Sequence, residues 1–364
     1  MALTKPFGFQ ASQAAAPLTG WAGDLGTGFT ATRAWGTLPT SDGGLIVNGQ
    51  AITQYKGSTY SNEHLKLDSS GNIDSSYTGR NTNSAGCYRT IELGGVLYTV
   101  GFWTNFTPYR FMKTNLSTGA LDSTFSSNVG TALNSSIRGI TTDGTSLFVA
   151  GNFTSPQTRL AKYSTSGVRD TGWTANANGY VYTIEFDTYD NTFIIGGEFT
   201  SVNGAGRNYV AKLNLDGSLN SWNPGASGFC STAIPAGNGE VFIGAKNGAP
   251  KVVNQSGTTV SSFGNTSNWK DSAYYGGLTS GGDFIVPLPD GFSTFDGTSV
   301  TSKAYAIVNK NGLVSAHGTK NSSTLTVYSV SPNNDNPVVS GNFTSIDSTT
   351  RGYVAAFDSS GNLV

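Results

Sequence analysis

The feature that most constrains the fold is a phrase at residues 193–222, FIIGGEFTSVNGAGRNYVAKLNLDGSLNSW, because degraded copies of it recur about every 48 residues. Self-similarity at a fixed period of this length is typical of stacked supersecondary units. A glycine in the turn after the AKLN segment marks each copy. It falls at Gly71, Gly119, Gly167, Gly217, Gly257, Gly312 and Gly361. These markers predict seven repeat units.

Two further markers keep the same period. The glycine of the GGEFTS segment recurs at Gly49, Gly101, Gly151, Gly197, Gly244 and Gly341. An additional copy is disguised as FIVPLPDGF, where Pro287 and Leu288 replace the glycine pair. A ring side chain follows the turn at Tyr77, Phe125, Trp173, Trp222, Phe263 and His317.

The last turn glycine, Gly361, has no ring side chain after it, whereas Phe29 lies one period before Tyr77. We therefore expect the two chain ends to complete one unit. An N-terminal strand around Phe29 would then complete the last blade and close a ring, which protects sheet edges that would otherwise aggregate.

The best copy reads as four short strands, YVYTIEF, NTFIIGGEFT, NYVAKLNL and LNSWNP, separated by turn-forming Asp, Asn and Gly. We detect no helical signals. Four strands in about 48 residues match a propeller blade. The sequence predicts an all-β fold, a seven-bladed β-propeller of four-stranded blades at 24–364, preceded by an extension at 1–23.

Composition limits the partners of such a ring. Charged residues are 12% of the chain and the net charge is −1, so the surface must consist mainly of Ser, Thr, Asn and Gly. No basic patch suggests nucleic acid, and no apolar run is long enough for a transmembrane helix. The first 20 residues lack the apolar core of a secretory signal. We expect a chain made in a cytoplasm, without membrane insertion.

Few residues are suited to catalysis. Cys87 and Cys230 fall in the first strands of units that are not neighbours in a seven-fold ring, so we interpret them as small buried residues rather than a disulfide or metal pair. His317 occupies the slot of the aromatic marker, which favours packing. His64 stands where the best copy has Val210. We predict no enzyme activity, no catalytic residues and no cofactor.

Two acidic segments suggest a calcium site. They are FDTYDN, with Asp187 and Asp190, and LDSSGNID, with Asp68 and Asp74. Neither has the spacing that gathers several oxygens around one ion, and Asp, Asn and Ser are common in turns. We interpret both segments as turns and predict no metal site. Seven Asn-x-Ser/Thr matches, without a secretory signal, predict no glycan.

If YVYTIEF is the innermost strand, one position of each unit faces the central channel or its mouth. Tyr182 holds it in the best copy, and its equivalents are Trp35, Arg89, Arg138, Ser231, Tyr275 and Tyr328. A circle of Tyr, Trp and Arg can bind a sugar or a peptide by stacking and hydrogen bonding. The alternative is that these side chains fill the channel.

Three segments carry a resemblance to a known family: GGEFTSVNGAGRNYVAKLNLDGSLNSWNP, AGNFTSPQTRLAKYSTSGVRDTGW and SGNFTSIDSTTRGYVAAFDSSGNL. They resemble the delta-60 type β-propeller repeat, which is found in bacteriophage virion components and bacterial surface proteins. The resemblance covers about residues 24–364 and departs from the pattern in the fifth unit, which lacks the FTSVNGAGR loop. It implies the propeller fold and no catalytic residues.

Two functions remain open after this reading. The first is a structural, adaptor or adhesive component of a phage virion, in the tail or a surface appendage. Its extension at 1–23 would dock onto other virion structural proteins, and a host surface glycan or receptor would be a second partner. The alternative is a propeller of the bacterial cell surface, or a glycan-binding propeller.

Overall fold

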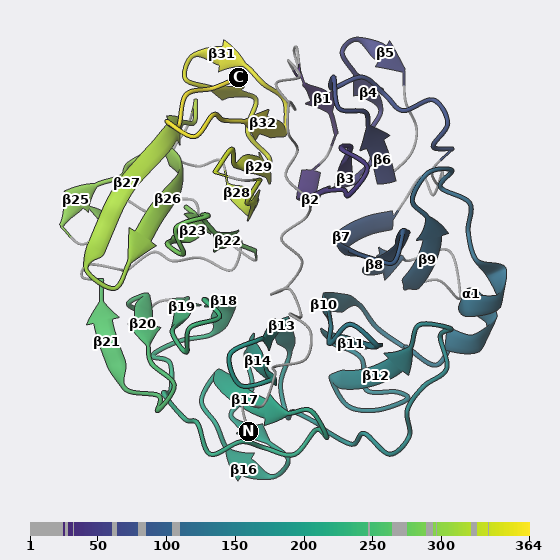
Figure 1. Cartoon of the computed structure of the whole chain (residues 1–364), viewed down its shortest axis with the longest axis vertical. Coiled ribbons are helices and arrows are strands. Elements are labelled where there is room, and N and C mark those ends of the chain that lie inside the picture. Colours follow the sequence, from purple (N-terminus) through teal and green to yellow (C-terminus); the bar gives the residue numbers. More distant parts are fainter. Residues whose placement is uncertain are drawn as a thin grey trace, which may run out of the picture.

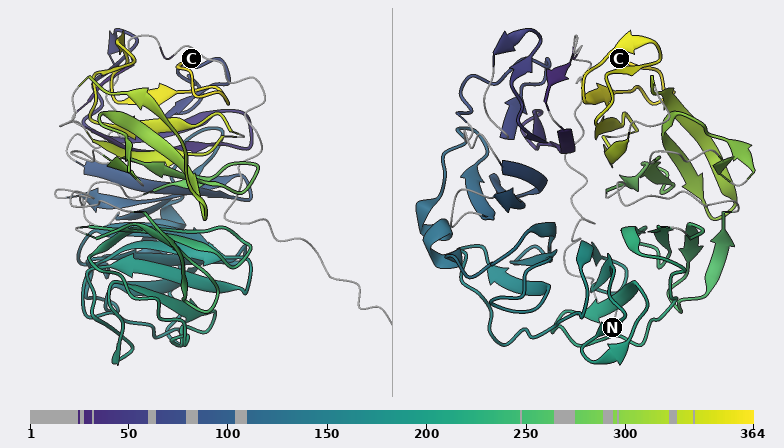
Figure 2. Two further views of the ribbon diagram at one scale, coloured as in Figure 1. Left: turned by 90° about the vertical axis from the view of Figure 1, so that its left-hand side faces the viewer. Right: turned by 180° about the vertical axis from the view of Figure 1, so that it is seen from behind.

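The computed structural model describes residue 25 and residues 28–31, 33–59, 64–78, 85–103, 110–246, 248–263, 275–288, 294–295, 297–321, 326–333 and 335–364. The expected docking extension, residues 1–23, lies outside these residues. The described structure is almost entirely β, and groups of strands follow one another around a common centre in chain order (Figure 1). The side view in Figure 2 shows that the groups together form a thick disc.

The first strand of each group lies nearest the centre. These strands are β2 (Arg33–Pro39), β7 (Ala85–Leu93), β10 (Ile137–Thr142), β13 (Val181–Asp187), β18 (Cys230–Pro235), β22 (Gly277–Leu278) and β28 (Val327–Ser331). Neighbouring first strands contact each other, as β7 does β10 and β10 does β13. Side chains of these strands therefore lie nearest the axis.

The second strand of each group pairs antiparallel with the first, and the third pairs antiparallel with the second, moving outward. The second strands are β3 (Leu45–Gln50), β8 (Val96–Trp103), β11 (Ser146–Gly151), β14 (Thr192–Gly197), β19 (Val241–Ala245), β23 (Phe284–Pro287) and β29 (Val338–Gly341). The third are β6 (His64–Leu67), β9 (Phe111–Asn115), β12 (Leu160–Ser164), β17 (Val210–Asn214), β20 (Lys251–Val253), β26 (Lys303–Asn309) and β32 (Val354–Ala356). The disguised FIVP segment is thus a second strand.

The fourth strand is the weakest part of the repeat. It is formed by β21 (Thr259–Ser262) and β27 (Gly312–Thr319). In other groups it shrinks to a single isolated bridge, such as the one between Leu213 and Leu219, where the sequence predicted a strand LNSWNP. Short hairpins replace some expected turns: β4 (Gln54–Tyr55) with β5 (Ser58–Thr59), β15 (Ser201–Val202) with β16 (Ala205–Gly206), β24 (Thr294–Phe295) with β25 (Thr298–Ser299), and β30 (Ser345–Ile346) with β31 (Thr349–Thr350).

One helix, α1 (Ser123–Val129), contradicts the expectation that helical signals are absent. Asp122 caps its N-terminus by accepting a hydrogen bond from the Phe125 N–H at 2.9 Å, and Gly130 ends it with a φ of 61°. A helix of 7 residues is too short to show a 3.6-residue period, so the pattern could not reveal it. No helix of the described part of the chain could cross a membrane.

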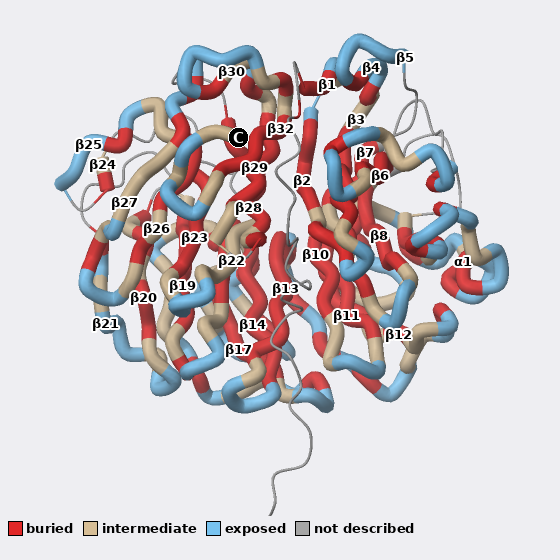
Figure 3. Tube along the Cα trace, turned by 45° about the horizontal axis from the view of Figure 1, so that its top comes forward, coloured by how far each residue is buried: buried red, intermediate tan, exposed pale blue. Residues whose placement is uncertain are grey.

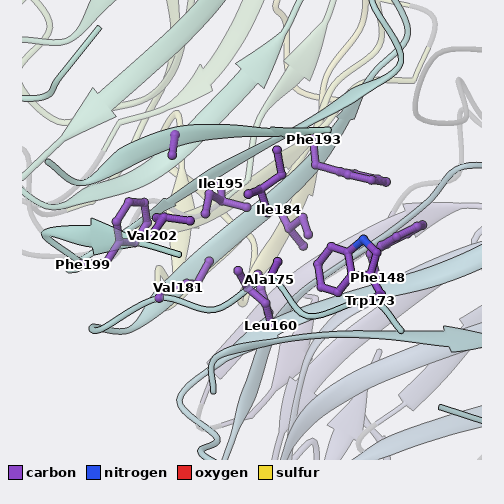
Figure 4. Close-up of a cluster of buried hydrophobic side chains, with 14 of the residues drawn as sticks. Phe148, Leu160, Trp173, Ala175, Val181, Ile184, Phe193, Ile195, Phe199 and Val202 are labelled. Atoms are coloured by element: carbon purple, nitrogen blue, oxygen red, sulfur yellow. The ribbon is translucent and has the colours of Figure 1, made fainter. Parts of the chain in front are cut away.

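The hydrophobic core lies between neighbouring groups of strands rather than in one place. Phe148 and Leu160 of one sheet pack against Ile184 and Phe193 of the next, and Trp173 lies over them (Figure 4). Burial follows the strands, while the turns at the periphery are exposed (Figure 3). Each fully buried Phe or Ile side chain contributes about 1.5–3 kcal/mol. Every group of strands therefore depends on its neighbours for stability.

The first and last groups of strands also lie side by side (Figure 1). β2 contacts β28 and β29. Thr37 Oγ1 donates to Ser331 Oγ at 2.9 Å, and Ser331 Oγ donates to the carbonyl of Thr37 at 2.6 Å. One core cluster joins Val47 of the first group to Val338 of the last.

The strand expected around Phe29 is β1 (Phe29–Thr30), and its partner differs from the expectation. Phe29 pairs with Tyr55 of β4, in the first group of strands. Contact with the last group is a parallel bridge between Gly28 and Gly352, where a Cβ on Gly28 would lie 2.4 Å from the Gly352 nitrogen. Among the described residues, the first and last groups share no sheet.

Candidate functional site

A β-bulge interrupts the inner strands at a constant place and sets which residues are available at the centre. In β13 the register shifts between Val181 and Thr183, so Tyr182 has no residue opposite it. The same shift occurs in β2, β7, β10, β18 and β28. The bulged residues are Trp35, Tyr88, Arg138, Tyr182, Ser231 and Tyr328.

Sequence alignment placed Arg89 in this set, and the structure places Tyr88 there instead. The register of β7 shifts between Cys87 and Arg89, which makes Tyr88 the bulged residue. The residue before the shift pairs with a glycine of the second strand in every bulged strand except β18, as Cys87 does with Gly101 and Val181 with Gly197. Counting from that glycine would have identified Tyr88, which the sequence analysis missed.

Several bulged side chains meet on the axis in an aromatic cluster. The Trp35 ring lies 4.8 Å from Tyr328 and 5.1 Å from Tyr88, measured between ring centroids. The Arg138 guanidinium lies 4.1 Å from the Tyr88 ring, and Arg33 lies 5.1 Å from Trp35. These three rings are buried. The rings come from the first, second and last groups of strands. The cluster therefore brings residues that are distant in the sequence into contact.

Beside this cluster an ion pair links two inner strands. Arg89 of β7 forms a bidentate pair with Glu185 of β13, in which Nη2 donates to Oε2 at 2.8 Å. The guanidinium also lies 4.7 Å from the Tyr275 ring, whose hydroxyl donates to the carbonyl of Arg138. Burial acts to lower the pKa of Arg89, but the Glu185 carboxylate outweighs it and the pKa is raised.

Glu185 is the second residue that the sequence analysis missed. Its side chain is 11% exposed and that of Arg89 is 20% exposed, so both charges are largely removed from water. A desolvated, bidentate pair of this kind fixes geometry, and removing either partner leaves a costly unpaired charge. The sequence signal for it is an acidic residue three positions after the bulged Tyr182.

Tyr182 stands apart from the other predicted site residues. Its hydroxyl donates to the Glu198 carboxylate, and its ring lies 6.4 Å from Tyr180. Tyr180 is 39% exposed and has the Arg159 guanidinium 5.2 Å from its ring. The structure thus brings Trp35, Arg89, Arg138, Tyr275 and Tyr328 together and leaves Tyr182 in a separate, more exposed group.

The histidines and cysteines have structural surroundings. His64 is buried, and burial lowers its pKa to about 4. Its Nδ1 lies 2.7 Å from the Tyr77 hydroxyl, within hydrogen-bonding distance. Cys87 and Cys230 are buried and are not joined by a disulfide, and burial raises the pKa of Cys230 to about 12. Neither thiol is poised to act as a nucleophile.

His317 packs as the aromatic markers do. It stacks on Tyr305 with the centroids 5.2 Å apart, and a Cβ on Gly361 would lie 2.0 Å from its Nδ1. Trp173 packs against Gly217 in the same manner. The ring side chain of one unit therefore covers the turn glycine of the next, which explains why both markers recur together.

The acidic segments that suggested calcium are held by turns and a lysine. Asp187 and Asp190 both contact Lys212 Nζ, at 3.2 Å and 2.8 Å. Asp68 accepts the N–H groups of Ser70 and Asn72, each at 2.9 Å. No metal-binding cluster of His, Cys, Asp or Glu occurs within the described ranges.

Comparison with known proteins places these features in a class. Residues 190–221 match the family model described as "Domain of unknown function (DUF5122) beta-propeller". The crystal structure of the C-terminal WD40 domain of Sif2 is similar, with a TM-score of 0.54 and 11% identity, covering 89% of this chain and 81% of that chain. The computationally designed Ika8 protein has a TM-score of 0.52 and 11% identity over 91% of this chain and 97% of its own.

At such low identity these structures establish the fold alone. No curated protein matches the chain in sequence. The repeat, the radial groups of strands and the propeller family model agree with each other. The chain is a β-propeller repeat protein.

Proposed function

We propose that this β-propeller is a non-enzymatic structural, adaptor or adhesive component of a bacteriophage particle, in the tail or a surface appendage. The scaffold role is supported by the contacts at the centre of the molecule. There the Arg89 guanidinium pairs with the Glu185 carboxylate and lies over the Tyr275 ring. Such contacts favour a rigid platform over a catalytic cavity. The phage assignment rests on the resemblance to the delta-60 type repeat.

In this proposal the propeller has seven blades of three or four strands, and its first and last blades close the ring by packing. The paired hydroxyls of Thr37 and Ser331 and the bridge between Gly28 and Gly352 support closure. Replacing Gly28 with Val should disturb that bridge, because its φ is 76° and a Cβ would overlap Gly352. An unchanged melting temperature would refute a role for this contact in closure.

The proposed partners are other virion structural proteins, bound through residues 1–23, and a host surface glycan or receptor. The protein would be made in the host cytoplasm and carried in the virion, without membrane insertion. Deleting residues 1–23 should leave a folded ring that no longer joins the particle. A variant with residues 1–23 in scrambled order is the control. Normal incorporation of the deleted form would contradict the docking role.

A glycan-binding or bacterial surface propeller is the second candidate, and one observation favours it. The Trp35 Nε1–H is buried and has no hydrogen-bond partner within the described residues. Such a donor at the centre is costly unless a ligand supplies an acceptor. Trp35→Phe should reduce glycan binding on an array, whereas Trp173→Phe, which removes a bond to the Leu215 carbonyl, should not. An array without hits would contradict this candidate.

A further inference from the structure

Four of the third strands carry a lysine at the same position, and the lysine in the fourth group has different partners from the others. The lysines are Lys66, Lys113, Lys162 and Lys212, and the carbonyl of each accepts the N–H of a residue that follows the turn. In the first three groups that residue is an aspartate, which also pairs with the lysine side chain. In the fourth group it is Asn220, so Lys212 lacks this carboxylate partner.

Lys212 contacts two other carboxylates instead. Its Nζ lies 3.2 Å from Asp187 Oδ2, at the end of β13, and 2.8 Å from Asp190 Oδ2, in the turn before β14. The side chains of Lys212 and Asp187 are 1% and 0% exposed, and that of Asp190 is 34% exposed. The carboxylates that pair with the three equivalent lysines are all 20–40% exposed. Of the four lysines, only Lys212 therefore meets a carboxylate that is fully removed from water.

This arrangement favours a covalent bond between the two buried groups. Reacting atoms held about 3–3.5 Å apart behave as if present at about 10⁵–10⁸ M, which offsets the poor equilibrium of amide formation in water. A buried ion pair also carries the desolvation cost of both charges, whereas an amide is neutral. Amide formation at Lys212 and Asp187 would remove that cost.

We propose that Lys212 and Asp187 condense to an isopeptide bond in the folded chain. The Nζ lone pair forms a bond to Asp187 Cγ, the bond from Cγ to Oδ2 breaks, and Oδ2 leaves as water. Two of the three ammonium protons leave with this oxygen. Asp190 carries them, because its carboxylate contacts the same Nζ, and it ends ionised as it began.

The second oxygen of Asp187 is held ready for this reaction. The backbone N–H of Tyr189 donates to Asp187 Oδ1 at 3.1 Å. This oxygen bears the negative charge of the tetrahedral intermediate and becomes the amide carbonyl, so the donor stabilises both. The new bond would join β13 to β17 across β14. It goes beyond the proposed scaffold role and does not depend on it.

The test is mass spectrometry of the purified full chain after denaturation. The intact mass should be lower than the calculated mass by one water. Trypsin should leave a branched peptide that joins residues 170–207 to residues 208–246, because an acylated Lys212 is not cut. Lys162 and its partner Asp170, which are 24% and 40% exposed, are the internal control and should be recovered as separate, unlinked peptides.

Variants separate the reacting group from the proton carrier. Lys212→Arg keeps the positive charge but cannot form the amide, so its mass should equal the calculated mass. Asp190→Asn, at a partly exposed turn, keeps both reacting groups and should slow the linkage by about a hundredfold. Asp190→Glu should restore the linkage, and Lys162→Arg, the matched control, should link as the parent does. Circular dichroism checks that each variant is folded.

Other outcomes overturn the proposal. A parent chain at its full calculated mass, with Lys212 cut by trypsin, would reject the bond outright. Loss of water without the branched peptide would mean a succinimide at an Asp-Gly turn. Linkage of the Asp190→Asn variant at the parent rate would overturn the role of Asp190. Incorporation of the Lys212→Arg protein into particles is measured separately, so failure of the bond and failure of the scaffold role are distinguishable.

Discussion

The first and fourth groups of strands solve the same packing problem with different chemistry. In the fourth, Gly196 pairs with Val210, and the position is apolar. In the first, the corresponding pair is Asn48 with His64, which are both buried and polar. A repeat position can therefore change from apolar to polar, provided that its neighbours supply hydrogen bonds.

The hydrogen bonds to Asn48 and His64 come from the neighbouring group of strands. Thr90 Oγ1 of β7 donates to Asn48 Oδ1 at 2.9 Å and lies 3.3 Å from His64 Nε2. The network is neutral. A separate, ionic network is present in both groups: Lys212 pairs with Asp187, with side chains 1% and 0% exposed, and Lys66 at the equivalent third-strand position of the first group pairs with Asp74. The comparison teaches that neutral and ionic networks should respond differently to truncation and to pH.

The largest effect is expected at the ionic network. Lys212→Met should destabilise the protein by about 3–5 kcal/mol, because it leaves the fully buried Asp187 without its cation. Urea denaturation monitored by fluorescence measures the change. The double variant Lys212→Met with Asp187→Asn should recover part of the loss. A loss below about 1 kcal/mol in the single variant would show that this pair is not needed for stability.

The neutral network should control acid stability. The pKa of His64 is about 4 in the folded protein and 6.5 in its reference state, so the unfolded chain binds more protons between these values. Stability contributed by the neutral imidazole is complete above pH 6.5 and is lost as the pH falls through 4. The loss is about 3 kcal/mol, measured by denaturation at several pH values.

His64→Val is the matched control, since it introduces the residue that the fourth group has at this position. Its stability should fall less between pH 6.5 and 4 than that of the parent protein. Parallel pH profiles for the two proteins would assign the acid sensitivity to other groups.

A smaller effect is expected from a single hydrogen bond of the neutral network. Tyr77→Phe removes the hydroxyl that lies 2.7 Å from His64 Nδ1 and keeps the ring in its core position. The expected loss is about 1–2 kcal/mol, because a buried acceptor or donor on His64 is left unsatisfied. Calorimetry should show this as a lower melting temperature. A higher melting temperature would contradict the hydrogen bond.

The smallest effect is expected at a third-strand lysine whose pair is exposed. Lys162 contacts Asp170 at 3.0 Å, and their side chains are 24% and 40% exposed. Lys162→Met should cost about 0–1 kcal/mol, and the difference from the parent should shrink at high salt. A loss as large as that of Lys212→Met would show that burial does not decide the strength of these pairs.

Much of the fold was accessible from the sequence, because the repeat fixes spacing and local pattern. The strand register confirms that His64 holds the same position in its copy of the repeat as Val210 does in the best copy. The helix α1 and the β15–β16 hairpin were missed, since each is too short to generate a periodic signal. Several expected edge strands are single bridges, such as the one between Leu213 and Leu219.

The centre was less predictable than the strands. Five of the seven residues predicted to face the channel do meet there, although Arg89 does so through its ion pair with Glu185 and not from the bulged position. A bulge shifts the register by one residue, and an alignment of the inner strands that does not count from the second-strand glycine misplaces the bulged residue. Pairing of Arg89 with Glu185, on strands far apart in sequence, depends on the curvature of the whole molecule.

The bulge in the inner strands has a consequence for how such a chain can diversify. A residue without a cross-strand partner can be exchanged while the ladder on either side keeps its pairing. In this chain, Trp35, Arg138 and Ser231 occupy that one position in different copies. Substitutions at this position in each copy can therefore change the side chains at the centre while the pairing of the surrounding strands is kept.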